Sequence, residues 1–136
     1  NYQTSSNKLV VANSDTETPL IEGDFSAATL KVNGSLSVTG SMTMGVNSTI
    51  TSSTTFNGTA TIIPVEATST SVTLTIDSDQ LVAGRILIIK TMNAASANLV
   101  ITSEGSETID GYSTWTLTSS WESVTIFSDG SNWYII

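Results

Sequence analysis

The chain has 136 residues, no Cys and no His, and its twelve acidic residues against four basic ones give a formal net charge of −8. Without His and Cys there is no imidazole or thiolate catalysis, no disulfide and no closed zinc site. Four basic residues cannot neutralise a run of phosphates, so we expect no nucleic-acid partner. No apolar run approaches the roughly 20 residues of a membrane helix, so we expect no membrane insertion.

Composition and periodicity favour β-structure. Ser and Thr make up a third of the residues, and only 12% of the chain is charged. Thr, Val, Ile and aromatic residues suit the pleated surface of a sheet. Apolar and polar residues alternate at a period of two throughout, whereas no segment repeats its apolar residues at helical spacing. The sequence therefore predicts an all-β protein.

The first predicted elements are short and separated by turn residues. Residues 8–12 (KLVVA) are typical of a strand, which the polar residues 13–15 end. Residues 18–25 (TPLIEGDF) form an extended piece around Pro19.

The next stretch, LKVNGSLSVTGSMTMG at residues 30–45, keeps its apolar residues on even positions and interrupts them with Gly-containing turn signals. Residues 32–37 and 38–43 align as two units with a period of six. We expect Val46 and Ile50 to continue the same face. The predicted apolar row consists of Leu30, Val32, Leu36, Val38, Met42, Met44, Val46 and Ile50.

This apolar row has nothing in its own chain to cover it. Two hexapeptide-like repeats are too few for a self-sufficient solenoid, because each unit buries its apolar face only against neighbours. Three identical chains wound about one axis would bury the row and would also remove exposed strand edges. We therefore predict that residues 1–61 form an intertwined trimeric β shaft with the apolar row at its core.

The remaining residues, 62–136, are richer in large apolar side chains and predict a compact head domain. Turn residues separate the six predicted strands, which cover residues 72–76, 85–90, 98–102, 114–117, 124–127 and 133–136. Strands of this length and spacing predict a small antiparallel β-sandwich or jelly-roll-like head.

Two stretches of the chain resemble known viral proteins. Residues 7–25 (NKLVVANSDTETPLIEGDF), followed by LKVNGSLSVTG at 30–40, resemble a recurrent module of tailed-phage fibre and spike proteins. Residues 84–90 (GRILIIK) and 108–136 (TIDGYSTWTLTSSWESVTIFSDGSNWYII) are similar to a small β domain at the ends of phage and large-virus fibres. The resemblance implies a homotrimeric fibre segment, located on the virion beside other virion proteins, with a thin shaft and a C-terminal head.

Acidic residues invite a calcium or catalytic interpretation. Asp77-Ser78-Asp79 offers alternating oxygens, and Glu104, Glu107 and Asp110 fall in one loop region. The twelve-residue calcium loop with its Gly and terminal Glu is absent, and Asp is favoured at turns, so we favour turn and surface roles. We predict no metal site, no cofactor and no enzymatic activity.

Aromatic side chains are the candidate receptor contacts, because their apolar rings can stack on sugars. Tyr112 follows the turn residues Asp110-Gly111, and Trp115 lies beside a Thr/Ser-rich stretch, so we take these two as contact candidates. For Trp121 we favour packing in the core or between subunits, and more strongly so for Trp133, which lies in a terminal apolar strand.

Arg85 opens the most apolar predicted strand. A partly buried Arg usually finds a carboxylate, so we expect a structural ion pair there rather than a ligand site.

Two functions of different classes follow from these features. The first is a homotrimeric viral fibre protein whose head attaches the virion to a host-surface glycan or protein, where weak single sites suffice because many bind together. The alternative is a purely structural spacer or decoration segment of a tail or capsid without receptor binding. A third hypothesis is a secreted bacterial adhesin or sugar-binding module that works as a monomer.

Overall fold

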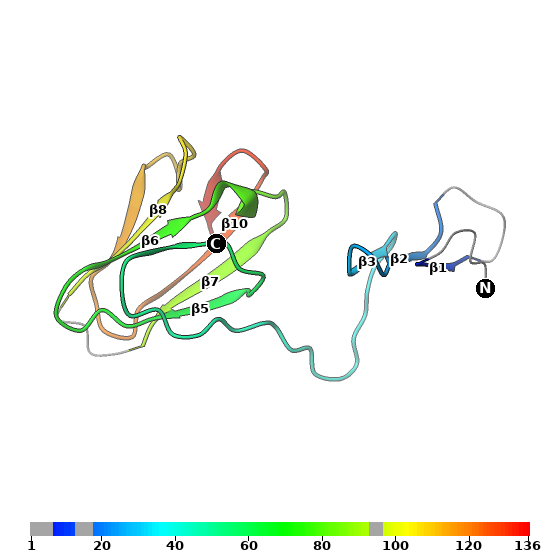
Figure 1. The fold of residues 1–136 in the computed structure, drawn as a ribbon, viewed down its shortest axis with the longest axis horizontal. Helices are drawn as coiled ribbons and strands as arrows, with labels where there is room; N and C mark the ends of the chain where they lie inside the picture. Colours follow the sequence, from blue (N-terminus) through cyan, green and yellow to red (C-terminus); the bar gives the residue numbers. More distant parts are fainter. Residues whose placement is uncertain (1–6, 13–17, 93–96) are drawn as a thin grey trace. The chain divides into compact units, whose positions relative to one another are not determined.

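A computed structural model of the protein describes residues 7–12, 18–92 and 97–136 (Figure 1). The described chain is all-β, with three sheets of which none is closed. It divides into two compact units, residues 1–42 and 43–136. This boundary lies nearer the N-terminus than the predicted one between residues 61 and 62, and residues 43–61 accordingly belong to the head unit.

The small N-terminal unit is an antiparallel sheet of three strands in the order β1-β2-β3. The strands are β1 (Lys8–Val11), β2 (Ile21–Asp24) and β3 (Thr29–Val32). Gly23 in β2 lies opposite Leu9 of β1 and Leu30 of β3. A Cβ atom at Gly23 would come within 3.2 Å of the Leu9 Cβ, so the glycine leaves room for these two leucines over the middle strand.

We expect acid to weaken this small unit. Lys8 lies opposite Asp24 in the β1–β2 register, and the two side chains form an ion pair. This bond with Lys8, then hydrogen bonds from Ser26 and Ala27, hold the pKa of Asp24 well below its usual 3.8. A depressed folded-state pKa stabilises the fold above the pKa of the unfolded chain, and this stabilisation is lost as the pH falls below about 4.

Amide-proton exchange of β1 to β3 measured against pH would detect that loss. Asp24→Asn removes the titrating carboxylate. The variant should therefore have lower protection factors than the parent at neutral pH, and its protection factors should fall less on acidification. Parallel pH profiles for the parent and the variant would contradict this assignment.

Between the small sheet and the head, residues 33–45 form no strand. Asn33 closes the small unit, because its backbone and side-chain N–H groups donate to the carbonyls of Leu20 at 2.9 Å and Pro19 at 2.8 Å. Within the part of the chain that the structure describes, no strand pairs with residues 34–44, whose short strands are predicted to form in the intertwined shaft. Their pairing with other copies of the chain stays a prediction.

The head is a sandwich of two four-stranded sheets in the orders β11-β10-β7-β5 and β4-β6-β8-β9, called sheet 1 and sheet 2 below (Figure 1). All six predicted strands form within one or two residues of their expected bounds. The elements are β4 (Thr54–Phe56), β5 (Ile62–Val65), β6 (Val72–Ile76), the 3-10 helix η1 (Ser78–Gln80), β7 (Ile86–Thr91), β8 (Leu99–Ser103), β9 (Thr114–Leu117), β10 (Ser123–Ser128) and β11 (Trp133–Ile135).

Period-two alternation builds the core between the sheets. In β6, β7 and β10 every second residue is buried, and the intervening residues face outward. The fully buried side chains come from both sheets and from the loop before β9: Ile63, Val65, Val72, Leu74, Ile76, Leu87, Ile89, Leu99, Ile101, Ile109, Ile126 and Trp133. The predicted core position of Trp133 is confirmed.

The predicted antiparallel pairing of the head is wrong in half of its strand pairs. The pairs β4–β6, β5–β7 and β6–β8 are parallel, and β7–β10, β10–β11 and β8–β9 are antiparallel. From β4 to β8 each strand lies in the opposite sheet to the strand before it. The chain therefore winds as a coil in which every second strand is a parallel neighbour, and the two terminal hairpins cap the coil.

The coil begins before β4, at residues 46–50. Val46 bridges Ile62 and Ile50 bridges Val65, both in parallel, so this segment lies at the edge of sheet 1. Ile50 follows Val46 by four residues, whereas Val65 follows Ile62 by three, so the segment contains one extra residue, a β-bulge. The extra residue places the side chains of Val46 and Ile50 on opposite sides of the sheet. Ile50 consequently packs on the core of the head, whereas Val46 is 62% exposed on the outer side. The prediction that Val46 and Ile50 share one face is wrong.

Candidate functional site

The loops of the head gather at its two ends, because its strands all run along one direction or its reverse (Figure 1). Residues 43–45 lead into what we call the proximal end, where the Thr61 N–H donates to the Gly45 carbonyl at 2.9 Å. Loops 57–61, 77–85, 104–113 and 129–132 lie at this end. Loops 51–53, 66–71 and 118–122 lie at the opposite, distal end.

Tyr112 lies on a tight turn at the proximal end. Asp110 and Gly111 have φ values of 49° and 84°, as a type I′ turn requires and as Asp-Gly readily adopts. On either side of them, Ile109 and Tyr112 exchange backbone hydrogen bonds of 2.8 and 2.9 Å. The Tyr112 side chain is 64% exposed. The turn thus presents to solvent one of the two predicted contact residues.

The other predicted contact residue, Trp115, lies in edge strand β9. It pairs with Ile101 and shares its side of the strand with buried Leu117. Its half-buried ring packs on the core of the head. Tyr112 and Trp115 therefore do not present their rings together, and a receptor contact by either one stays a prediction.

Trp121 is the more conspicuous exposed aromatic residue. Its side chain is 58% exposed in the distal loop 118–122, and its φ is +62°. A bulky residue in the left-handed region is rare and costs about 1–3 kcal/mol, so the surrounding structure must hold it there. Trp121 does not join the core of its own head, and of the two packing roles predicted for it only the intersubunit one remains.

Polar contacts fix the loop that carries Trp121. The Glu122 carboxylate accepts hydrogen bonds from the backbone N–H groups of Thr118 and Ser119 at 3.0 and 2.9 Å. The Thr91 hydroxyl donates to the Glu122 carbonyl at 3.0 Å, and Lys90 Nζ donates to the Trp121 carbonyl. These bonds hold the backbone on both sides of the exposed indole ring.

The carboxylates considered as metal ligands or catalysts serve turns instead. Asp77 accepts from the backbone N–H of Asp79 at 2.8 Å and caps η1, and Glu104 accepts from that of Ser78 at 3.2 Å. Glu107 accepts from the Gly105 N–H at 3.1 Å. The turn roles predicted for Asp77 and Glu107 are confirmed, whereas Glu104 joins two loops that are distant in sequence.

The prediction of an ion pair at Arg85 is wrong for the described residues, in which this side chain binds uncharged oxygen atoms. Its guanidinium donates to the Ala60 carbonyl at 2.7 Å, to the Gln80 side-chain oxygen at 3.1 Å and to the Gly58 carbonyl at 3.4 Å. Burial lowers the pKa of Arg85, but a guanidinium stays protonated at neutral pH. Uncharged oxygen atoms of the surrounding loops thus accept the hydrogen bonds of the cation. Through Gly58 and Ala60, these bonds also attach the 57–61 loop to the start of β7.

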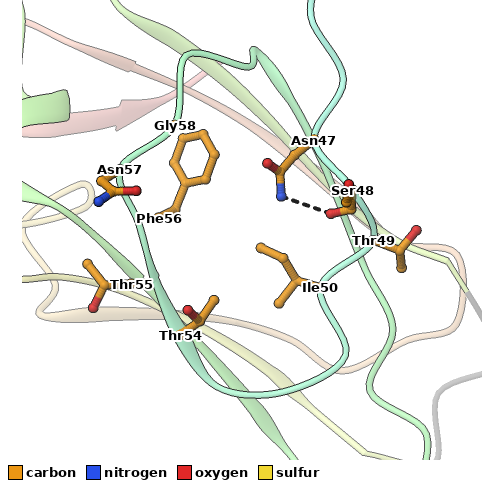
Figure 2. A pocket seen from close by; sticks show the side chains of 9 residues that line it. All are labelled: Asn47, Ser48, Thr49, Ile50, Thr54, Thr55, Phe56, Asn57 and Gly58. Atoms are coloured by element: carbon orange, nitrogen blue, oxygen red, sulfur yellow. Dashed lines mark hydrogen bonds between the residues drawn. The ribbon is translucent and has the colours of Figure 1, made fainter.

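A hollow of about 290 Å³ opens between the 46–50 segment and β4, where the edges of the two sheets diverge (Figure 2). Asn47, Ile50 and Phe56 point toward its middle, and Asn47 Nδ2 donates to the Ser48 carbonyl at 2.8 Å. The other lining residues are uncharged: Ser48, Thr49, Thr54, Thr55, Asn57 and Gly58. Such a lining offers hydrogen bonds and a small apolar floor, but no acid or base for catalysis.

The described residues also bear on metal binding and membrane spanning. Within residues 7–12, 18–92 and 97–136, no three His, Cys, Asp or Glu side chains are grouped so as to hold a metal ion. Across the same ranges, no helix has the length and apolar character needed to cross a membrane.

The chain was compared with known proteins at three levels. Comparison with protein families, with curated proteins and with solved structures found no match.

Proposed function

We propose that this chain is part of a homotrimeric virion fibre, in which the N-terminal region forms a shaft and the head attaches to a glycan on the host surface. One observation carries the proposal: the apolar row lies exposed along a segment without a strand partner. Leu36, Val38, Met42 and Met44 are 70%, 49%, 64% and 45% exposed in the single chain. The viral resemblance of the sequence points the same way.

Exposure of this kind favours assembly with identical copies. A contiguous apolar surface that water must cover usually marks a contact with another molecule. Residues 34–44 pair with no strand of the described chain, so we take copies of the chain about a three-fold axis as the partner of the row.

The distal loop is the contact that we assign to the host glycan. In a fibre whose shaft leads into the proximal end, the distal end faces away from the particle, and Trp121 lies there. An exposed indole on a backbone with positive φ is an outlier of the kind that functional sites maintain. Its flat apolar face suits the C–H face of a pyranose ring, and trimers on one particle would multiply a weak single contact.

Binding of the full chain, displayed at high valency on beads, to a glycan array and to host cells tests this function. Trp121→Gly removes the ring while keeping a residue that accepts positive φ, so we expect it to abolish binding. Tyr112→Ala tests the proximal alternative, and Thr116→Ala on the outer side of β9 is the control. Absence of any signal from the parent would favour the structural spacer, and unchanged binding by Trp121→Gly would exclude the distal loop.

A further inference from the structure

The two outer faces of the head differ sharply in chemistry. Strands of sheet 2 point mainly threonines outward: Thr55, Thr73, Thr75, Thr102, Thr114 and Thr116. Sheet 1 and its flanking residues instead present an outer apolar face, made of Val46, Ile62, Ile86, Ile88, Phe127, Tyr134 and Ile136, with Lys90, Ser123 and Thr125 as its polar members. A sandwich surrounded by water on both sides would be expected to have two polar faces.

The strand register joins the outer apolar face into one surface. Val46 bridges Ile62, Ile62 lies opposite Ile88, and Ile88 lies opposite Thr125, so these residues form a row across the sheet. A second row runs beside it from Ile86 to Phe127 and Tyr134. The rings of Phe127 and Tyr134 stack with centroids 5.4 Å apart.

The margin of this face is exposed within a single chain, and its middle residues are half-buried. Val46, Ile86 and Ile136 are 62%, 42% and 69% exposed. The one charged residue in the strands of sheet 1 is Lys90, whose Nζ is bound to the Trp121 carbonyl. Residues 43–136 carry eight acidic residues against two basic ones, and all eight acids lie outside the strands. Copies of a negatively charged head could therefore meet on this face without bringing carboxylates together.

We propose that the outer apolar face is the surface through which the three heads contact one another, turned toward the three-fold axis. The inference rests on the trimer of the proposed function and adds the orientation of the head. The main support is the position of Val46. This residue is the last exposed member of the apolar row predicted for the shaft, and it is also the first residue of the row that crosses sheet 1. If the shaft row lies at the axis, the neighbouring residues Ile62 and Ile88 follow Val46 there, and the threonine face of sheet 2 faces solvent.

Distances between spin labels in the full-length assembly test this orientation. The chain has no Cys, so Thr125→Cys and Thr75→Cys each give one label per copy, on opposite faces of the sandwich. Packed sheets lie about 10 Å apart, so labels on the face turned outward lie about 10 Å farther from the axis. Distances between equivalent points about a three-fold axis are the square root of three times their distance from it, so these labels are about 17 Å farther from one another. We expect the shorter separation at position 125. A trimer with equal separations, or a shorter one at 75, would overturn the inference and leave the fibre proposal standing.

A charge substitution gives an independent measurement. Ile88→Glu places three carboxylates at the proposed contact and should raise the trimer dissociation constant about tenfold or more, whereas Thr75→Glu should leave it unchanged. Circular dichroism of both variants checks that the head has folded. Equal dissociation constants would contradict contact between copies through this face and overturn the inference. A monomeric parent chain would overturn the inference together with the trimer.

Discussion

Val38→Asp is expected to abolish trimer assembly of the full chain. Val38 lies in the middle of the apolar row and is 49% exposed in the single chain. In a three-fold shaft the substitution would bring three carboxylates together near the axis and take them out of water. Like charges placed against one another cost several kcal/mol, and unpaired charges removed from water cost more. Light scattering coupled to size-exclusion chromatography would then report the mass of one chain instead of three.

Ser37→Asp is the matched control. It adds the same charge one residue away, on the odd-numbered side of a segment whose apolar residues are all even, so the trimer should persist. Trimers formed by both variants would show that the even-numbered row is not the core of the assembly. Loss of the trimer in both would point to a general sensitivity of the segment to charge.

The sequence predicted best those elements in which burial follows a simple period. Strand β6 reads Val-Thr-Leu-Thr-Ile and buries its first, third and fifth residues. The order of six strands in the head could therefore be predicted from alternation and turn residues alone. Strand β5 was missed because Pro64 argues against a strand. Its carbonyl accepts from the Ile50 N–H at 3.0 Å, so Pro64 faces the bulged 46–50 segment, where a residue without an N–H is tolerated.

Strand pairing could not be predicted in the same way, because alternation says which residues are buried but not which strand lies beside which. The connection from β5 to β6 could return within one sheet or cross to the other, and the residues between Val65 and Val72 suit either path. Crossing produces the parallel pairs of the observed coil. The bulge between Val46 and Ile50 could not be predicted for a related reason. One additional residue moves every later side chain of the strand to the other side of the sheet, and alternation in the sequence does not show where such a residue lies.

The candidate contacts depended on loop conformation, which composition describes poorly. Tyr112 was placed correctly on a loop because Asp-Gly specifies its turn. Trp121 has no such neighbour, and its exposure follows from contacts made by Glu122, Lys90 and Thr91, two of which are distant in sequence. An aromatic residue beside a strand suggests packing until those contacts are known.

Trp133→Ala should destabilise the head by about 3–5 kcal/mol, the usual cost of removing a large buried aromatic side chain. Trp133 is 1% exposed, and its backbone N–H and carbonyl bind Thr108 and Asp110 at 2.8 and 3.0 Å. The side chain thus fills the core at the point where the 104–113 loop joins β11. Since domains of this size are stable by only about 5–15 kcal/mol, urea unfolding followed by far-UV circular dichroism should show a large fall in midpoint.

Trp121→Ala removes the same atoms from a residue that is 58% exposed, and therefore serves as the matched control. Its ring contributes little buried area, so the change should lie within about 1 kcal/mol of the parent. Similar losses in the two variants would mean that Trp121 is buried in solution, which a neighbouring copy of the head could cause. A small loss for Trp133→Ala would instead contradict the packing of β11 on the core. The pair of substitutions thus separates an indole that holds the head together from one that is free to bind.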